Sequence, residues 1–312
     1  MASLAKFTNC VQQTAKRQVK AIVVVCSMLL TNAWAELPMT KVLMSDARAP
    51  NDIRLMYKLN VITESLELTE EEYGPFELFI NTGRMKNERA VRRLESGGAE
   101  NIHFGLTSLE LEQRLIPIRI PIRMGALNYR LLLIHKNDLE KFAQVKTLEQ
   151  LKKLQVGLGA HWVTRKVLEP EGFKVIPSNT YEGLFKMLEM GRYDYTIRGP
   201  HEIYGELELF RDEAPNMVIE PTLALHIVAP FYIFVSPHEP VLAERIEKGL
   251  SNMVHSGRLR EMFLDHYQDH IEKAQIPQRN IIHVPNRLLP NETPIGDDAL
   301  WFWPAELNAN QN

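Results

Sequence analysis

Cysteine is nearly absent from this chain: two of its 312 residues are cysteines, Cys10 and Cys26. That scarcity excludes a small domain held together by disulfides, and the composition excludes collagen-like and low-complexity chains. A basic excess is lacking too, because 36 Lys and Arg stand against 39 Asp and Glu, so nothing points to a nucleic-acid partner. The long apolar runs of multi-pass membrane proteins are also missing. What remains is a globular protein long enough for one large or two medium domains.

The first 35 residues have the pattern of an export signal. They contain four basic side chains and no acidic one, and a short apolar stretch follows at 21–30. Small residues at Ala33 and Ala35 complete a secretory signal peptide, with cleavage predicted after Ala35 and the mature protein in the periplasm. A membrane anchor needs about twice this apolar length. A lipoprotein needs its cysteine at the end of the apolar stretch, whereas Cys26 lies in its middle.

Removal of the signal changes the chemistry available to the mature chain. Both cysteines leave with it, which excludes disulfides, thiolate catalysis and cysteine-bound metal. Four of the 36 Lys and Arg also leave, so 32 basic side chains remain against 39 acidic ones and the net charge becomes −7.

From residue 41 onward the pattern alternates between strands and helices, which predicts an α/β architecture. Strands are expected at 41–44, 76–80, 102–106, 129–135, 155–160, 173–177, 193–197, 222–228 and 231–235. Helices are expected at 52–68, 87–95, 147–154, 162–168, 180–190, 201–211, 239–255 and 258–274. The last 36 residues are rich in Pro and Asn and are expected to be mostly irregular.

The stretch 115–123 alternates with a period of two. Isoleucine occupies the even positions, and Pro117, Arg119, Pro121 and Arg123 occupy the opposite face. Such alternation predicts extended chain. Because proline cannot donate a hydrogen bond to a sheet, the two prolines exclude a central strand, and we expect an edge strand or a strap over a core.

Three stretches, in this order and spacing, resemble the bilobed extracytoplasmic solute-binding proteins of the amino-acid-binding type, family 3. Residues 147–198 resemble that family's second lobe, and residues 231–259 resemble the return into its first lobe. Residues 107–114 contain a threonine and then an arginine, as the family does near its cleft. The resemblance extends over about residues 41–275 and identifies the chain as a divergent member. It implies an α/β, two-lobe periplasmic-binding-protein-like (type II) fold with two crossing hinge strands.

The resemblance also implies a division of the chain and a way of binding. The signal peptide is 1–35, lobe 1 comprises 40–128 plus 231–312, and lobe 2 comprises 132–226, with hinge strands near 127–135 and 224–234. In the family, a small ligand binds between the lobes, which close over it by hinge motion.

Arg114 is the first candidate for ligand binding, together with Thr107. In the family the matching arginine pairs with the ligand's carboxylate, and a planar guanidinium suits that role as a two-pronged donor. The alternative is a surface arginine paired with Glu110 and Glu112 on a short helix.

A second group of candidates lies where a helix begins after Gly159. Free N–H groups at the start of a helix attract anions, so His161, Trp162 and Thr164 are expected to hold one end of the ligand, with Trp162 stacked over it. The alternative is an ordinary helix start with a packed tryptophan.

Arg198 departs from the family's pattern. The amino-acid binders usually place an acidic residue near this point, after the strand 193–197, where it holds the ligand's ammonium group. A cation here favours an anionic ligand over an ordinary α-amino acid; the alternative is an ion pair with Glu202. Three more arginines lie near the expected cleft or pair with surface acids: Arg119, Arg123 and Arg130.

The ten histidines do not predict a metal site. His266 and His270 are four residues apart on one helix, but no third ligand is evident. We therefore expect neither a metal nor a cofactor.

The sequence predicts a monomeric periplasmic solute-binding protein that captures a small polar, anionic ligand, amino-acid-like or an organic acid, for an ABC-type uptake system. Its partners are expected to be that ligand and an inner-membrane permease or receptor, not nucleic acid. One alternative is a periplasmic sensor domain for a signalling receptor. The other is a dehydratase-like enzyme on the same fold, for which Glu202 and His161 are the acid–base candidates.

Overall fold

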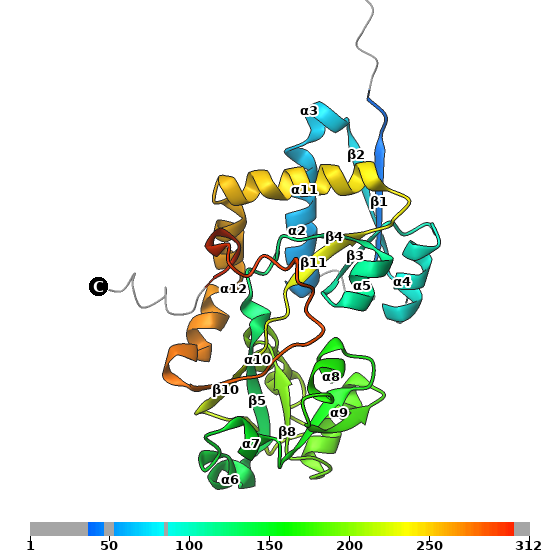
Figure 1. Ribbon diagram of the computed structural model, residues 1–312. Coiled ribbons are helices and arrows are strands. Elements are labelled where there is room, and N and C mark those ends of the chain that lie inside the picture. Colours follow the sequence, from blue (N-terminus) through cyan, green and yellow to red (C-terminus); the bar gives the residue numbers. More distant parts are fainter. Residues whose placement is uncertain (1–36, 47–52, 84–86, 303–312) are drawn as a thin grey trace, which may run out of the picture.

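The computed structural model describes residues 37–46, 53–83 and 87–302, and these form two lobes, each built around its own sheet (Figure 1). The predicted signal peptide lies outside the described residues. The first sheet has the order β2-β1-β3-β11-β4, with parallel pairing at β2-β1-β3 and antiparallel pairing at β3-β11-β4. Its strands are β1 (Thr40–Ser45), β2 (Phe76–Asn81), β3 (Ile102–Leu106), β4 (Ile116–Ile118) and β11 (Phe231–Val235).

Helices from both ends of the chain cover the first sheet. They are α2 (Ile53–Glu67), α3 (Glu70–Tyr73), α4 (Asn87–Glu95), α5 (Leu109–Arg114), α11 (Pro240–His255) and α12 (Arg258–Ala274). The apolar stripe of α11, with Ile246 and Leu250, packs on Val61 of α2 in one core. The two helices approach so closely that a Cβ at Gly249 would lie 2.0 Å from the carbonyl oxygen of Ser65. Glycine at 249 is therefore required by this helix contact.

The second sheet has the order β12-β10-β5-β8-β6-β7, with β9 paired to β5. Its strands are β5 (Tyr129–His135), β6 (Gln155–Gly159), β7 (Lys174–Ser178), β8 (Tyr195–Arg198), β9 (Met217–Ile219), β10 (Leu223–His226) and β12 (Asn280–His283). Its helices are α6 (Leu139–Ala143), α7 (Leu148–Leu151), α8 (Val163–Leu168), α9 (Tyr181–Glu189) and α10 (Pro200–Leu209). Leu132 and Leu133, in the apolar centre of β5, point to separate cores on the two faces, as expected of a central strand.

Two chain segments connect the sheets and are joined at Asn128. One runs from β4 to β5 and the other from β10 to β11. Asn128 is buried, accepts a hydrogen bond from the backbone of Ile227 through its carbonyl (2.8 Å) and one from Ala229 through its side chain (2.9 Å). The two crossings are therefore held together at their midpoint.

The C-terminal segment differs from the expectation of a mostly irregular tail, because it connects the lobes a further time. Residues 231–312 are predicted for lobe 1, yet β12 pairs in parallel with β10 of the second sheet. The chain then returns past the crossing, where the Asn286 side chain donates to the Val228 carbonyl (2.8 Å) and the Leu288 carbonyl accepts from the Leu109 backbone (3.0 Å). The remaining boundaries of the two lobes stay a prediction.

The returning segment ends in the core of the first lobe. Trp301 and Phe302 are 2% and 4% exposed, and the Trp301 ring lies against Gly125, which has a φ of +74°. The sequence of this segment, rich in Pro and Asn, does not predict this course, because its stabilising contacts are with residues far away in the sequence.

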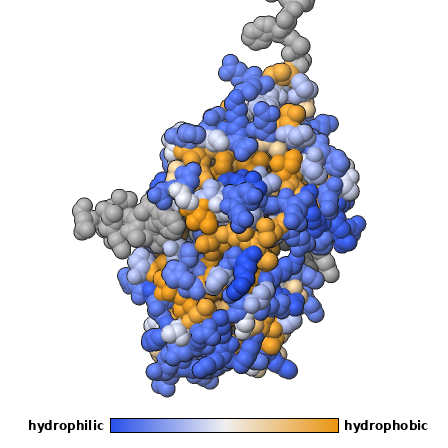
Figure 2. Space-filling view, in the orientation of Figure 1, coloured by the Kyte–Doolittle hydropathy of each residue, from blue (hydrophilic) through white to orange (hydrophobic). Residues whose placement is uncertain are grey.

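All of the predicted strands and helices are present, and their ends differ from the predicted ones by at most three residues. Five have the predicted bounds at both ends: β3, β5, β11, α4 and α12. The capping box of Thr147 and Gln150 is confirmed at the start of α7. The alternating stretch 115–123 contributes only β4, at the edge of the first sheet, as its prolines predict. Within the described residues, no helix has the length and apolar character needed to cross a membrane. Figure 2 shows hydrophobic patches that extend across the lobe junction, while hydrophilic residues cover the outer ends of both lobes.

Candidate functional site

Three buried arginines gather where the lobes meet. Arg123 lies on the crossing between β4 and β5, Arg130 lies on β5, and Arg198 ends β8. Their exposed fractions are 5%, 6% and 6%. Arginine is almost never this buried unless it is paired, because removing its charge from water is costly. Whether each guanidinium group has a carboxylate partner therefore matters for the chemistry of this cluster.

Arg198 is already neutralised by carboxylates of α10. Its Nε donates to Glu206 Oε2 (2.6 Å), its Nη2 donates to Glu206 Oε1, and Glu202 lies 3.2 Å from Nη2. The guanidinium also lies 4.7 Å from the ring centre of Trp162. Burial lowers the pKa of Arg198, but Glu202 and Glu206 outweigh it and raise that pKa above its ordinary value. Arg198 thus links β8, α10 and Trp162.

Arg123 and Arg130 have no carboxylate partner among the described residues. Arg123 lies over the Phe231 ring (4.2 Å) and its Nη1 lies 3.3 Å from His201 Nε2. The buried Nε atoms of both arginines make no hydrogen bond in the described part of the chain. Burial, reinforced by the charges of Arg198 and Arg123, lowers the pKa of Arg130 to about 10, and Glu202 opposes this shift. The Arg130 guanidinium therefore remains protonated at neutral pH.

His201 contributes a neutral donor to the same cluster. Burial lowers the pKa of His201 well below its ordinary value, and the three arginines add to this effect against the opposing charge of Glu202. Because Nε2 faces a guanidinium that can only donate, that nitrogen accepts, and Nδ1 carries the proton. Nδ1 is buried and has no hydrogen-bond partner among the described residues.

The electrostatic balance of this cluster favours an anion. Three guanidinium groups face the two carboxylates of Glu202 and Glu206, and His201 is neutral, so one positive charge is left. Burial raises the pKa of Glu202, but Arg198, His201, Arg130 and Arg123 reverse this and hold it well below its usual range. Glu202 also accepts a hydrogen bond from the Gly199 backbone (3.2 Å). It is therefore a fixed carboxylate, poorly suited to give and take protons.

A small pocket lies beside Arg130 between the lobes. It has room for about one water molecule, and the exposed atoms of its wall are apolar. Leu106 of β3 contributes to it from the first lobe, and Thr164 of α8 from the second. Ala229 of the β10–β11 crossing forms another part of its wall. The pocket thus has walls from both lobes and from one of the crossings.

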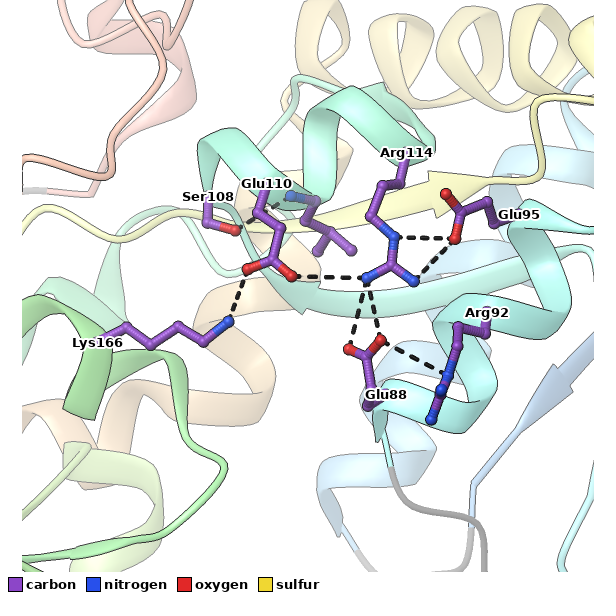
Figure 3. A network of polar contacts seen from close by, with 8 residues as sticks. Glu88, Arg92, Glu95, Ser108, Glu110, Arg114 and Lys166 are labelled. Atoms are coloured by element: carbon purple, nitrogen blue, oxygen red, sulfur yellow. Dashed lines mark hydrogen bonds and ion pairs between the residues drawn. The ribbon is translucent and has the colours of Figure 1, made fainter.

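Arg114 lies outside this cluster, in a network on the first lobe (Figure 3). Its guanidinium contacts Glu95 (2.8 Å), Glu88 (3.2 Å) and Glu110 (3.6 Å). Glu110 in turn pairs with Lys166 of α8 (2.6 Å), so the network crosses from the first lobe to the second. Arg114 is therefore bound by protein carboxylates, as in the alternative interpretation of a surface arginine. Through Glu110 and Lys166 the same network also reaches the second lobe.

The other sequence candidates lie in different surroundings. Thr107 is fully buried and donates to Glu112, which also binds Arg119 (2.7 Å). His161 is exposed, Trp162 is half-buried beneath Arg198, and Thr164 lines the pocket. The structure thus places Trp162 against Arg198 and Thr164 in the pocket wall, with Thr107 next to the pocket residue Leu106. Arg114 is instead held by carboxylates.

Arg123, Arg130 and His201 were not among the residues singled out as ligand contacts. Both Arg123 and Arg130 carry charge near the expected cleft, and for Arg123 its alternation with isoleucines was a further signal. The position of His201 after Gly199-Pro200 gave none. Among the described residues no group of three or more His, Cys, Asp or Glu is placed to hold a metal ion.

Comparison with solved structures supports the fold. A probable amino-acid ABC transporter extracellular-binding protein from Bacillus subtilis matches with a TM-score of 0.53 and 18% identity, over 75% of this chain and 99% of that one. A Streptococcus mutans structure of glutathione import through a cystine ABC importer matches with a TM-score of 0.55 and 11% identity, over 74% and 96%. A histidine kinase sensor domain with similarity to periplasmic binding proteins matches with a TM-score of 0.51 and 14% identity, over 74% and 96%.

No protein-family model matches the chain, and no curated protein matches it in sequence. The predicted α/β two-lobe fold is confirmed by the two sheets and by these structures, and the identities of 11–18% agree with a divergent sequence.

Proposed function

We propose that this chain is an exported solute-binding protein that holds a small anionic ligand between its lobes and presents it to an inner-membrane uptake system. The observation that supports this most is the pair of buried guanidinium groups, Arg123 and Arg130, whose Nε atoms find no hydrogen-bond partner among the described residues. Buried donors without partners are rare in proteins, because each costs roughly 1–3 kcal/mol. An anion between the lobes would satisfy them.

Three side chains would donate hydrogen bonds to the ligand's acidic group. Arg130 lies beside the interlobe pocket, Arg123 stacks on Phe231, and His201 directs its Nδ1–H from α10. Charge-assisted hydrogen bonds of this kind are about twice as strong as neutral ones. The polar edge of α8, with Thr164, would contact the rest of the ligand.

An ordinary α-amino acid fits this cluster poorly. Its ammonium group needs a carboxylate, and both buried carboxylates of the cluster, Glu202 and Glu206, are bound to Arg198. The predicted preference for an anion without a free ammonium group, such as an organic acid, therefore follows from the pairing. Arg198 supports the site by fixing α10 and does not contact the ligand.

Titration calorimetry with the mature chain tests this proposal. Mono- and dicarboxylates, inorganic phosphate and α-amino acids are the probes, and we expect saturable binding of a carboxylate or phosphate. Loss of one charged hydrogen-bond donor removes about 1.5–3 kcal/mol, so Arg130→Met and Arg123→Met should each weaken binding roughly 10- to 150-fold. Arg192→Met, at an exposed position of the same lobe, is the matched control. Binding that survives both cluster variants, or a chain indifferent to every anion, would contradict the proposal.

A sensor role is the second candidate, favoured by the match to a histidine kinase sensor domain. Both roles use the same anion site and differ in the membrane partner. A neighbouring gene for a permease and its ATPase supports uptake, whereas a receptor kinase supports signalling. An enzymatic role is disfavoured by the fixed ionisation of Glu202 and by the exposure of His161.

A further inference from the structure

Two histidines meet at the ends of neighbouring strands, and one of them, His226, follows Leu225, the register partner of Arg130. His226 ends β10 and His283 ends β12, and the parallel register pairs them directly. Their Nδ1 atoms lie 3.2 Å apart, and the ring centres are 5.0 Å apart with the planes inclined by 67°. Nothing in the proposed binding of an anion uses this pair.

The spacing of the two nitrogens is that of two ligands on one metal ion. Histidine nitrogen binds zinc at about 2.0–2.1 Å, and two nitrogens 3.2 Å apart then subtend an angle of about 100° at the metal. This angle lies between the square-planar and tetrahedral values, so it suits copper and zinc.

The surroundings keep the pair ready to bind. The Tyr129 ring packs 4.9 Å from the His226 ring and fixes its orientation. Without metal, one Nδ1–H donates to the other Nδ1. When both Nδ1 atoms bind a metal, that proton moves to Nε2 of the same ring, so no proton is released.

We propose that His226 and His283 form a two-histidine site for a divalent transition-metal cation of the zinc or copper type, with water completing the coordination. His226 precedes the crossing at 227–230, and His283 precedes the C-terminal segment that returns to the first lobe. A bound metal would therefore join the hinge crossing to that segment. The site is independent of the anion cluster, so either one can fail without the other.

Calorimetric titration of the mature chain, free of any histidine tag, with ZnCl₂ and with CuCl₂ tests the proposal. We expect one saturable site, with affinity at least about tenfold weaker in His226→Ala and in His283→Ala. His270→Ala is the matched control, because His266 and His270 are the pair that sequence spacing alone would select.

Because His283 is exposed, His283→Ala should fold normally. This variant therefore tests the proposal even if His226→Ala does not fold. Unchanged melting curves by circular dichroism verify the fold of each variant. Binding that persists in His283→Ala, binding lost in His270→Ala, or no saturable binding of either metal would overturn the proposal.

Discussion

The buried pair of Arg198 and Glu206 gives the sharpest test of how the site is built. Glu206 is 3% exposed, and the two side chains share two hydrogen bonds. Removing one partner of a buried pair leaves the other charge uncompensated and typically costs 3–5 kcal/mol. We therefore expect Arg198→Met and Glu206→Met each to lower the free energy of unfolding by about 3–5 kcal/mol.

Combining Arg198→Met with Glu206→Met measures how much of each loss comes from leaving the other charge unpaired. Methionine at both positions removes both charges and fills the space with apolar atoms, a change that is often close to neutral. Glu202 still loses one partner, so we expect a loss of about 1–2 kcal/mol, far below the sum of the single variants. Urea unfolding followed by far-UV circular dichroism measures all three, with Arg192→Met as the exposed control.

Two outcomes would refute this reasoning. Single variants whose losses simply add in the double variant would show that the pair does not act as a unit. An Arg198→Met protein as stable as the parent, but with anion affinity reduced more than about tenfold, would show that Arg198 binds the ligand directly.

Four further predictions test other parts of the structure. Arg114→Met should leave anion affinity within about twofold by calorimetry, because its partners are protein carboxylates; a large loss would restore Arg114 as a ligand contact. Gly249→Val should cost at least about 2 kcal/mol in urea unfolding, since a Cβ would lie 2.0 Å from a carbonyl oxygen; unchanged stability would contradict the helix contact. Trp301→Ala should cost about 3–5 kcal/mol and lower the melting temperature, whereas an unaffected protein would mean that the C-terminal segment is not docked. Burial, with the charge of Lys58 against that of Asp46, lowers the pKa of His103 from 6.5 to about 4, so the unfolded chain binds a proton that the folded chain refuses. The free energy of unfolding should therefore fall by roughly 2 kcal/mol as the pH drops from about 6.5 to about 4. In unfolding curves measured across that range, His103→Gln should flatten this dependence. An unchanged pH profile in the variant would exclude His103 as its source.

Local sequence patterns predicted most of the elements correctly. Helices such as 258–274 and strands such as 129–135 follow from apolar periodicity and run length, which depend on neighbours within a few residues. Short elements such as α3 and β9 were missed because they lack enough residues to show a period. The strand β12 was missed because its four residues are stabilised by β10, more than fifty positions earlier.

The site divides in the same way. The sequence by itself determined that residues 36–312 lack cysteine and carry an acidic excess, and that several arginines fall near the expected lobe junction. It also determined that Arg198 stands where the resembling family usually has an acidic residue. Tertiary structure decided what each arginine does: Arg114 is saturated by Glu88 and Glu95, and Arg198 by Glu206.

Arg123 and Arg130 are left with unpartnered donors among the described residues, and that distinction depends on contacts that sequence spacing does not encode. The free energy of a buried charge depends on which opposite charge the fold brings within hydrogen-bonding distance. The distribution of charged residues therefore predicted a negatively charged ligand. The packing of α10 against β8 decided which arginines are paired and which are left for the proposed ligand.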